Sequence, residues 1–242
     1  MTNTSQGTRA PIAVALDAPD LGVVRAWSRA VAPVVSTLKV GLEVFCRDGA
    51  AAVHAARLGA SEVGSADVQI FLDLKLHDIP ATVAGAARAV AELEPAFLTV
   101  HASGGASMIE AAALALPDTR IVAVTVLTSM DDATLESIGM AGPSMDAAVR
   151  LAVLSVNAGA RAIVCSPLEV AAIRAAVADD IVLITPGVRP AGSAANDQKR
   201  VATPQEAIAS GADLLVIGRP ITGAADLTEA AWTIASQLGV EV

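Results

Sequence analysis

Three charged side chains, Asp73, Lys75 and Asp78, lie within six residues at the end of an apolar run. The run 71–74 is apolar enough to form a buried strand, and residues two apart on an extended strand point to the same side. We therefore expect Asp73 and Lys75 to point the same way. Pro80 suits the first turn of a following helix, with Asp78 as the cap of that helix.

A structural salt bridge is the alternative interpretation of this segment. For a single Asp–Lys pair, a structural salt bridge and a catalytic role are equally good explanations. A salt bridge accounts poorly for three charges at the end of a buried strand, because charges removed from water must be compensated. The segment is therefore the first candidate for acid–base chemistry in this chain.

Glycine and arginine residues near the end of the chain predict a phosphate site. Gly218 would let the backbone approach an anion, and Arg219 would supply a forked pair of hydrogen-bond donors. Arg189 follows soon after another glycine, and Gln198 is a neutral donor within the long polar loop 189–200. A plain turn with a surface arginine is the alternative at each position.

Thr128 follows another apolar run and is expected either to hydrogen-bond the polar edge of a ligand or to cap a helix. His101 ends a further apolar run and is expected to be a structural histidine, while His77 is assigned no role. The three histidines of the chain do not have the spacing of a zinc site. Neither a metal ion nor an organic cofactor is expected.

Apolar runs alternate with Ala-rich stretches of helical periodicity along the chain. The predicted strands are Ile12–Leu16, Val34–Val40, Ile70–Leu74, Phe97–Val100, Ile121–Leu127, Ala162–Cys165, Ile181–Ile184 and Leu214–Ile217. The predicted helices are Leu21–Ala32, Phe45–Leu58, Pro80–Leu93, Ala106–Leu116, Met145–Asn157, Pro167–Val177, Pro204–Ser210 and Ala224–Leu238. Gly59, Gly159 and Gly211 are expected to mark helix ends.

Strand and helix thus alternate as many times as in a (β/α)₈ barrel, so we predict a single α/β TIM-barrel domain over residues 1–242. A doubly wound open sheet is the alternative. Charged residues fall at the carboxyl ends of the first three predicted strands and the last: Asp17, Lys39, Asp73, Lys75 and Arg219. Because that face carries the active site in TIM barrels, we expect these residues to meet in one site.

The composition limits the possible partners. A net charge of −9 argues against general nucleic-acid binding, so an anionic ligand needs a local cationic site. Only 2% of the residues are aromatic although 54% are hydrophobic, so aliphatic side chains must fill the core. Neither a secretion signal nor a membrane span is expected, and Cys46 and Cys165 form no metal-binding pattern, so a reduced cytoplasmic protein is predicted.

The segment 71–80, Phe-Leu-Asp-Leu-Lys-Leu-His-Asp-Ile-Pro, resembles the signature of the orotidine 5′-phosphate decarboxylases. Further matches follow in order along the chain: 15–17, 38–41, 124–129, 185–190, 196–198 and 216–222. The resemblance is to the bacterial form, a barrel that pairs as a homodimer. It implies the decarboxylation of orotidine 5′-phosphate to UMP and CO₂, the last step of de novo pyrimidine synthesis, without a metal or cofactor.

The resemblance also implies a role for each matched residue. Lys75 corresponds to the proton donor, and Asp73 to the carboxylate placed against the leaving carboxylate. Lys39 and Asp78 complete the charge array, with Asp78 acting in the site of the partner subunit. The other positions are implied to bind substrate: Asp17 and Lys39 the ribose hydroxyls, Thr82 the ribose across the dimer, Thr128 the pyrimidine, and Arg189, Gln198, Gly218 and Arg219 the phosphate.

Two alternative functions are weighed against this one. A related sugar-phosphate decarboxylase or aldolase would use Mg²⁺ to hold an enediolate, and it would place an acidic residue near the end of the second strand. This chain has Lys39 in that region, which suits a metal-free site. A non-catalytic barrel that binds nucleotides would have no need for the charges of Asp73, Lys75 and Asp78, which are costly to bury.

Overall fold

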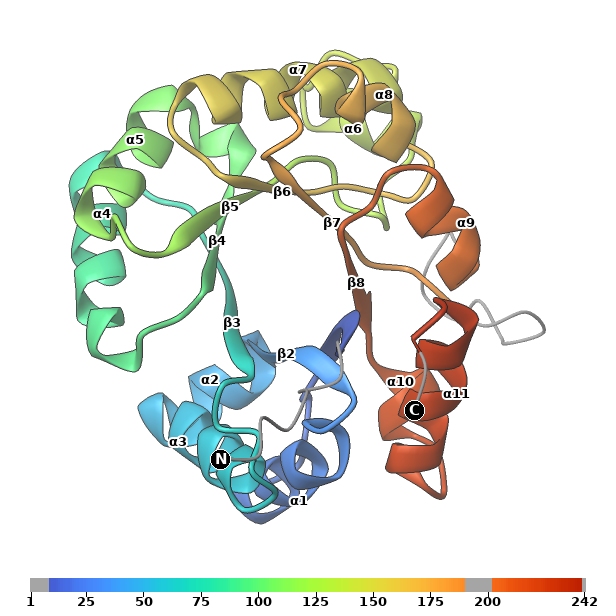
Figure 1. The fold of residues 1–242 in the computed structure, drawn as a ribbon. Coiled ribbons are helices and arrows are strands. Elements are labelled where there is room, and N and C mark those ends of the chain that lie inside the picture. Colours follow the sequence, from blue (N-terminus) through green and yellow to red (C-terminus); the bar gives the residue numbers. More distant parts are fainter. Residues whose placement is uncertain (1–8, 190–201, 241–242) are drawn as a thin grey trace.

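Parallel strands close into a barrel within residues 9–189 and 202–240, which are the residues that this computed structural model describes (Figure 1). Neighbours in the barrel follow chain order, and the last strand pairs with the first. The predicted (β/α)₈ barrel is confirmed, and the open-sheet alternative is wrong. The strands are β1 (Ala10–Ala15), β2 (Val35–Gly41), β3 (Gln69–Leu76), β4 (Phe97–His101), β5 (Arg120–Val124), β6 (Ala162–Val164), β7 (Val182–Thr185) and β8 (Leu214–Ile217).

Helices surround the ring of strands (Figure 1). The α-helices are α1 (Leu21–Val31), α2 (Leu42–Asp48), α3 (Ala50–Ser61), α4 (Pro80–Ala89), α5 (Ala106–Ala115), α6 (Asp132–Ser137), α7 (Ser144–Asn157), α8 (Val170–Arg174), α9 (Pro204–Ala209), α10 (Arg219–Thr222) and α11 (Leu227–Gln237). Short 3-10 helices are η1 (Ala91–Leu93) and η2 (Ala102–Gly104). No helix in the described part of the chain is long and apolar enough to cross a membrane.

Alternate residues of each strand point into the barrel, as the two-residue period of a strand requires. One inner layer is apolar, and in it the rings of Phe71 and Phe97 lie with centroids 5.5 Å apart. The other buried members of this layer are Ala13, Val122, Ala162, Ile184 and Leu214. Asp73 stands two residues beyond Phe71 and therefore points inward above this layer, toward the carboxyl ends of the strands.

The outer core lies between the strands and the helices, and small residues allow close packing there. A Cβ atom on Gly59 would lie 2.2 Å from the carbonyl oxygen of Arg25, so α3 and α1 approach each other closely at this glycine. The prediction that Gly59 ends a helix is therefore wrong, since it lies within α3. Gly159 and Gly211 do follow α7 and α9, with φ angles of 95° and 103°.

Several predicted boundaries differ from the structure. The predicted helix 45–58 is two helices, α2 and α3, because the chain turns at Gly49 with a φ of 58°. The predicted helix 224–238 begins only at Leu227, because the Asp226 side chain accepts the Glu229 N–H at 3.0 Å and caps it there. Helices α6 and α10 were not predicted, since such short helices show no periodicity of their own.

Two further predicted elements are shorter than expected. The predicted strand 121–127 ends at Val124, and the residues after it turn into the loop that precedes α6. The predicted helix 167–177 is reduced to α8, because the Glu169 side chain accepts the Ser166 N–H at 2.9 Å and holds the preceding residues in a turn. Both changes affect the segment that follows the carboxyl end of a strand.

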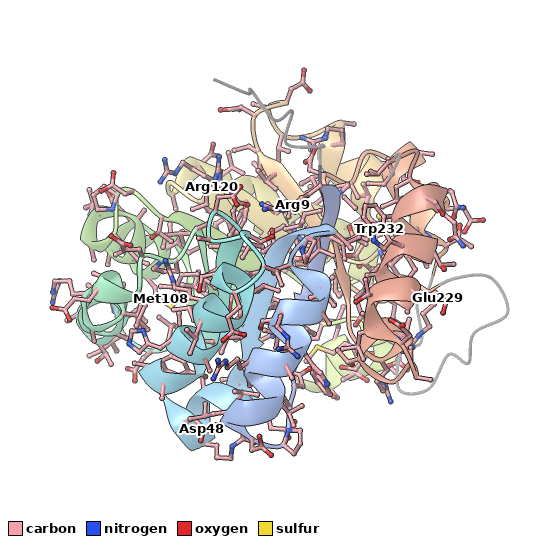
Figure 2. All side chains as sticks on the ribbon, turned by 60° about the horizontal axis from the view of Figure 1, so that its bottom comes forward. Arg9, Asp48, Met108, Arg120, Glu229 and Trp232 are labelled. Atoms are coloured by element: carbon pink, nitrogen blue, oxygen red, sulfur yellow. The ribbon has the colours of Figure 1, made fainter. Side chains whose placement is uncertain are left out.

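The two ends of the barrel can be told apart in Figure 2. Arg9 and Arg120, just before β1 and at the start of β5, lie toward one end, and Asp48, at the end of the helix after β2, lies toward the other. Arg9 pairs with Asp67 at 2.8 Å, and the Arg120 guanidinium lies 5.6 Å from the centroid of the Phe97 ring. The predicted site residues follow strands and so belong to the end opposite these arginines.

Candidate active site

Asp73 lies between two lysines at the carboxyl end of the barrel. Its Oδ1 is 2.7 Å from Lys75 Nζ, and its Oδ2 is 3.0 Å from Lys39 Nζ. The side chains of Asp73 and Lys39 are 14% and 8% exposed, while that of Lys75 is 28% exposed and reaches furthest toward solvent. Asp73 and Lys75 thus contact each other directly, and Lys39 from the neighbouring strand completes a row of alternating charges.

The lysines determine the ionisation of Asp73. Burial alone would raise the pKa of this carboxyl above its ordinary value of 3.8, but the positive charges of Lys39 and Lys75 and their hydrogen bonds outweigh burial. The resulting pKa is about 2. Asp73 is therefore a carboxylate at neutral pH, and it compensates for two ammonium groups that are largely removed from water.

The backbone at the Asp73–Lys75 contact differs from the extended strand that was assumed. Lys75 is not extended: its φ is 47°, in the left-handed region that residues with a side chain seldom occupy. Between Leu72 and Leu76 the register of β3 against β4 also shifts, so the strand bulges at this point. Bulges of this kind occur beside active sites, where they redirect a side chain. The bulge turns Lys75 Nζ back toward Asp73.

Asp17 and Lys39 are brought together over a glycine of β2. A Cβ atom on Gly41 would lie 2.9 Å from Asp17 Oδ1 and 3.1 Å from Lys39 Nζ, closer than such contacts normally come. The missing side chain at this position therefore makes room for both charged groups. Asp17 follows β1 and Lys39 lies on β2, so adjacent strands position this pair on the inner side of the barrel.

A cavity of about 330 Å³ opens at this end of the barrel. Its floor is apolar and includes Phe71, Val124, Val164 and Val216, which point inward from four different strands. Eight of the predicted site residues line it: Asp17, Lys39, Asp73, Lys75, Thr128, Arg189, Gly218 and Arg219. The remaining prediction for this cavity, Gln198, lies outside the described residues. Strand ends that are remote in sequence thus contribute to one cavity, and the roles of these eight residues stay predictions.

Asp78 and Thr82 do not line this cavity. Both residues are exposed. The predicted cap is also wrong: Ile79 is the N-cap residue of α4, and the Asp78 carboxylate accepts the Ile79 N–H at 2.6 Å. Pro80 does occupy the first turn of α4, as predicted. Asp78 thus projects from the rim of the barrel instead of into it.

Comparison with known proteins identifies the family. A model of the "Orotidine 5'-phosphate decarboxylase / HUMPS family" matches residues 10–234. The chain belongs to this family. The resemblance seen in the sequence motifs is therefore confirmed, and the match covers every strand and nearly every helix of the described barrel.

Members of the orotidine 5′-phosphate decarboxylase family are similar to this chain over almost its whole length. The orotidine 5′-phosphate decarboxylase of Thermobifida fusca is 64% identical over 229 residues, which cover 95% of this chain and 96% of that one. The protein of the same name from Rhodospirillum rubrum is 48% identical over 97% of this chain and 96% of its own. The crystal structure of orotidine 5′-phosphate decarboxylase from Lactobacillus acidophilus superposes on this chain with a TM-score of 0.77 at 34% sequence identity. The match covers 94% of this chain and 98% of that one.

Two histidines lie beside the charge array without lining the cavity of this family member. The rings of His77 and His101 have centroids 5.4 Å apart. Burial, the nearby His77 and the charge of Lys75 lower the pKa of His101 below its ordinary value of 6.5, so its ring is neutral at neutral pH. A neutral His101 adds no positive charge beside the lysines, and the structural role predicted for it stays a prediction.

Several residues of the site were missed by reasoning from the sequence. Thr99 is fully buried on β4 and contacts Asp73, and Cys165 and Pro186 line the cavity after β6 and β7. A signal for Thr99 was present, because it is the one polar residue between Phe97 and Val100 in a run that reads as a buried strand. Cys165 gave no signal, since apolar residues at strand ends are common, whereas Pro186 lies in the matched segment 185–190 without having been assigned a role.

Proposed function

We propose that this protein decarboxylates orotidine 5′-phosphate to UMP and CO₂, the last step of de novo pyrimidine synthesis. One observation carries the proposal: in a member of this family, the Asp73 carboxylate is held between Lys39 and Lys75 at the edge of a cavity that also contains two arginines. The array supplies fixed charges for the reaction, and the arginines supply a cationic site for the substrate phosphate.

Lys75 is proposed to stabilise and then protonate the pyrimidine carbon that loses CO₂. Breaking the bond between this carbon and the leaving carboxylate places an electron pair on the carbon. An ammonium group in a dry site stabilises that electron pair strongly. The same group then donates a proton to this carbon. Asp73 holds Lys75 in place at 2.7 Å and faces the leaving carboxylate. Because its pKa is about 2 before substrate binds, it enters the reaction as a carboxylate.

The rest of the cavity is proposed to bind the nucleotide. Asp17 and Lys39 hold the ribose hydroxyls, since both charged groups meet above Gly41. Thr128 reaches the polar edge of the pyrimidine above the apolar floor. The phosphate lies at Arg189, Gly218 and Arg219, together with Gln198. Arg189 Nε supports this placement, because it is buried and has no hydrogen-bond partner in the described part of the chain. A bound phosphate would satisfy it.

A homodimer with shared active sites is proposed to complete the array. Asp78 and Thr82 are exposed and lie outside their own cavity, so a partner subunit could receive them. Large apolar side chains are also exposed after two neighbouring strands: Ile79 is 66% exposed and Leu42 is 47% exposed. An isologous two-fold contact at this rim would cover these side chains and place Asp78 beside the array of the partner.

The reaction is proposed to need no metal ion. The Mg²⁺-dependent alternative calls for an acidic ligand near the end of β2, and Lys39 occupies this region with its ammonium group on Asp73. Within the described residues, His, Cys, Asp and Glu side chains form no group of three that could hold a metal. A cation at Asp73 would have to displace both lysines.

The experiment that tests the function is an assay of UMP formation from orotidine 5′-phosphate, with and without EDTA. We expect full activity in EDTA and no stimulation by added Mg²⁺. Activity that EDTA abolishes and Mg²⁺ restores would refute the metal-free mechanism. Tight binding of UMP without any turnover of orotidine 5′-phosphate would instead identify a non-catalytic nucleotide-binding barrel.

A further inference from the structure

The bulge in β3 has an unusual pairing with β4. Leu72 lies opposite Leu98, and Leu76 lies opposite Val100, so four residue steps on β3 span two steps on β4. The additional length is taken up around Lys75, whose φ is 47°. A bulge leaves backbone groups without a partner in the strand ladder, and a left-handed lysine is unfavourable unless its surroundings hold it there.

Thr99, between Leu98 and Val100 on β4, fills this gap in the ladder. Its hydroxyl oxygen accepts the Lys75 backbone N–H at 2.8 Å. The same hydroxyl donates its hydrogen to Asp73 Oδ1 at 3.1 Å. The side chain is fully buried, so no solvent can take over either hydrogen bond. One hydroxyl group thus holds the backbone of the proposed proton donor and the carboxylate that faces it.

Thr99 is not among the residues that line the cavity. It therefore acts through Asp73 and Lys75 and not on the substrate. Asp73 Oδ1 receives two donors, the Thr99 hydroxyl and Lys75 Nζ at 2.7 Å, and these two bonds fix the orientation of the carboxylate. A carboxylate without the hydroxyl bond could rotate, and Lys75 could return toward an extended backbone.

We propose that Thr99 is a positioning residue that holds Asp73 and Lys75 in the geometry needed for decarboxylation. This inference rests on the proposed function, because it assumes that Lys75 and Asp73 act in the reaction. Preorganised groups of this kind affect the transition state more than ground-state binding, since small displacements reduce the rate without removing the contacts that hold the nucleotide. The effect of losing the hydroxyl should therefore appear in kcat and not in KM.

The test uses the variants Thr99→Val and Thr99→Ser of the full-length protein. Valine keeps the shape of threonine and removes the hydroxyl, whereas serine keeps the hydroxyl. We expect Thr99→Val to lower kcat about tenfold to a hundredfold, the range for losing a hydrogen bond to a charged group, with KM and UMP affinity within about threefold. We expect Thr99→Ser to keep kcat within about threefold of the wild-type value.

Thr119→Val is the matched control. Thr119 is also buried, and its hydroxyl donates to the Pro95 carbonyl oxygen at 2.7 Å, but it precedes β5 at the opposite end of the barrel. This variant loses one buried hydrogen bond where Thr99→Val loses two, so some loss of stability is expected with kcat unchanged. If Thr99→Val does not fold, the pair Thr99→Ala and Thr99→Ser makes the same comparison, because they differ only in the hydroxyl.

Equal values of kcat for Thr99→Val and wild type would overturn the inference. So would equal losses in the valine and serine variants, because serine keeps the hydroxyl and valine does not, or a loss of kcat in Thr99→Val matched by an equal loss of UMP affinity. These outcomes all presuppose an active wild type. A wild-type protein that does not turn over orotidine 5′-phosphate would refute the proposed function itself, which the same assay shows separately.

Discussion

Lys75 Nζ lies 2.7 Å from Asp73 Oδ1 although the backbone of Lys75 has left the extended conformation. Had β3 continued regularly, both side chains would have pointed inward on parallel paths. The bulge instead turns the ammonium group onto the carboxylate, and Lys39 Nζ approaches the other oxygen at 3.0 Å. The two ammonium groups repel each other, and the negative charge of Asp73 between them offsets this repulsion. The predictions below follow from this arrangement.

Replacement of Lys75 by alanine should nearly abolish turnover. Loss of a general acid typically lowers the rate about a hundredfold to ten-thousandfold, so we expect kcat to fall by at least that range. UMP affinity should change far less, because the proposed role of Lys75 is in the transition state. Steady-state kinetics and calorimetric titration with UMP measure the two effects. A kcat within about tenfold of wild type, equivalent to roughly 1.4 kcal/mol, would rule out this role.

Stability should depend on pH through Asp73. Its pKa is about 2 in the folded protein and 3.8 in the unfolded chain, so the unfolded state takes up its proton first as the pH falls. The stabilisation that ionised Asp73 gives to the folded protein is complete at pH values above 3.8, the pKa in the unfolded chain. It is lost as the pH falls from there toward about 2, the pKa in the folded protein. Between pH 5 and pH 3 this loss amounts to about 1 kcal/mol.

Urea unfolding of wild type and Asp73→Asn at a fixed protein concentration measures this contribution. The asparagine variant lacks the titrating group, so its free energy of unfolding should fall by about 1 kcal/mol less over the same pH interval. It should also be the less stable protein at pH 7, because Lys39 and Lys75 then face each other without a compensating charge. Identical pH slopes for the two proteins would contradict a lowered pKa of Asp73.

Arg219→Ala should weaken the use of substrates that carry a phosphate. We expect kcat/KM for orotidine 5′-phosphate to fall about tenfold to a hundredfold, the range for losing a charge-assisted hydrogen bond. Activity on the nucleoside orotidine, which has no phosphate, should stay within about threefold. Arg29→Ala, an exposed position on α1, is the control and should leave both substrates unaffected. An equal loss on both substrates would place Arg219 outside the phosphate site.

A mixture of inactive Lys75→Ala and Asp78→Asn subunits should regain activity if sites are shared across a homodimer. Each mixed dimer would then contain one site with both native residues and one site with neither. Random pairing makes about half of the dimers mixed, so about a quarter of all sites should be intact. Native mass spectrometry can verify that subunits have exchanged. Verified exchange without any activity would show that Asp78 serves its own barrel.

The sequence by itself determined the architecture and the chemical character of the site. Alternating apolar runs and Ala-rich helical stretches predicted the barrel, because the periodicity of buried residues is a local property of the chain. The same alternation assigned Asp17, Lys39, Asp73, Lys75 and Arg219 to one face, since the strands of a barrel all point in one direction. The motif of residues 71–80 identified the family, which the comparisons confirm.

Only the tertiary structure decided how the charges meet. The extended conformation that was assumed from Asp73 to Lys75 is wrong at Lys75, where the pairing of β3 with β4 shifts register and the backbone is left-handed. No local pattern in the sequence records this pairing. Thr99 became part of the site through the same pairing, although it lies 26 residues from Asp73 in the chain. The pKa of Asp73 likewise depends on Lys39 from another strand, because burial and charge act through space and not along the sequence.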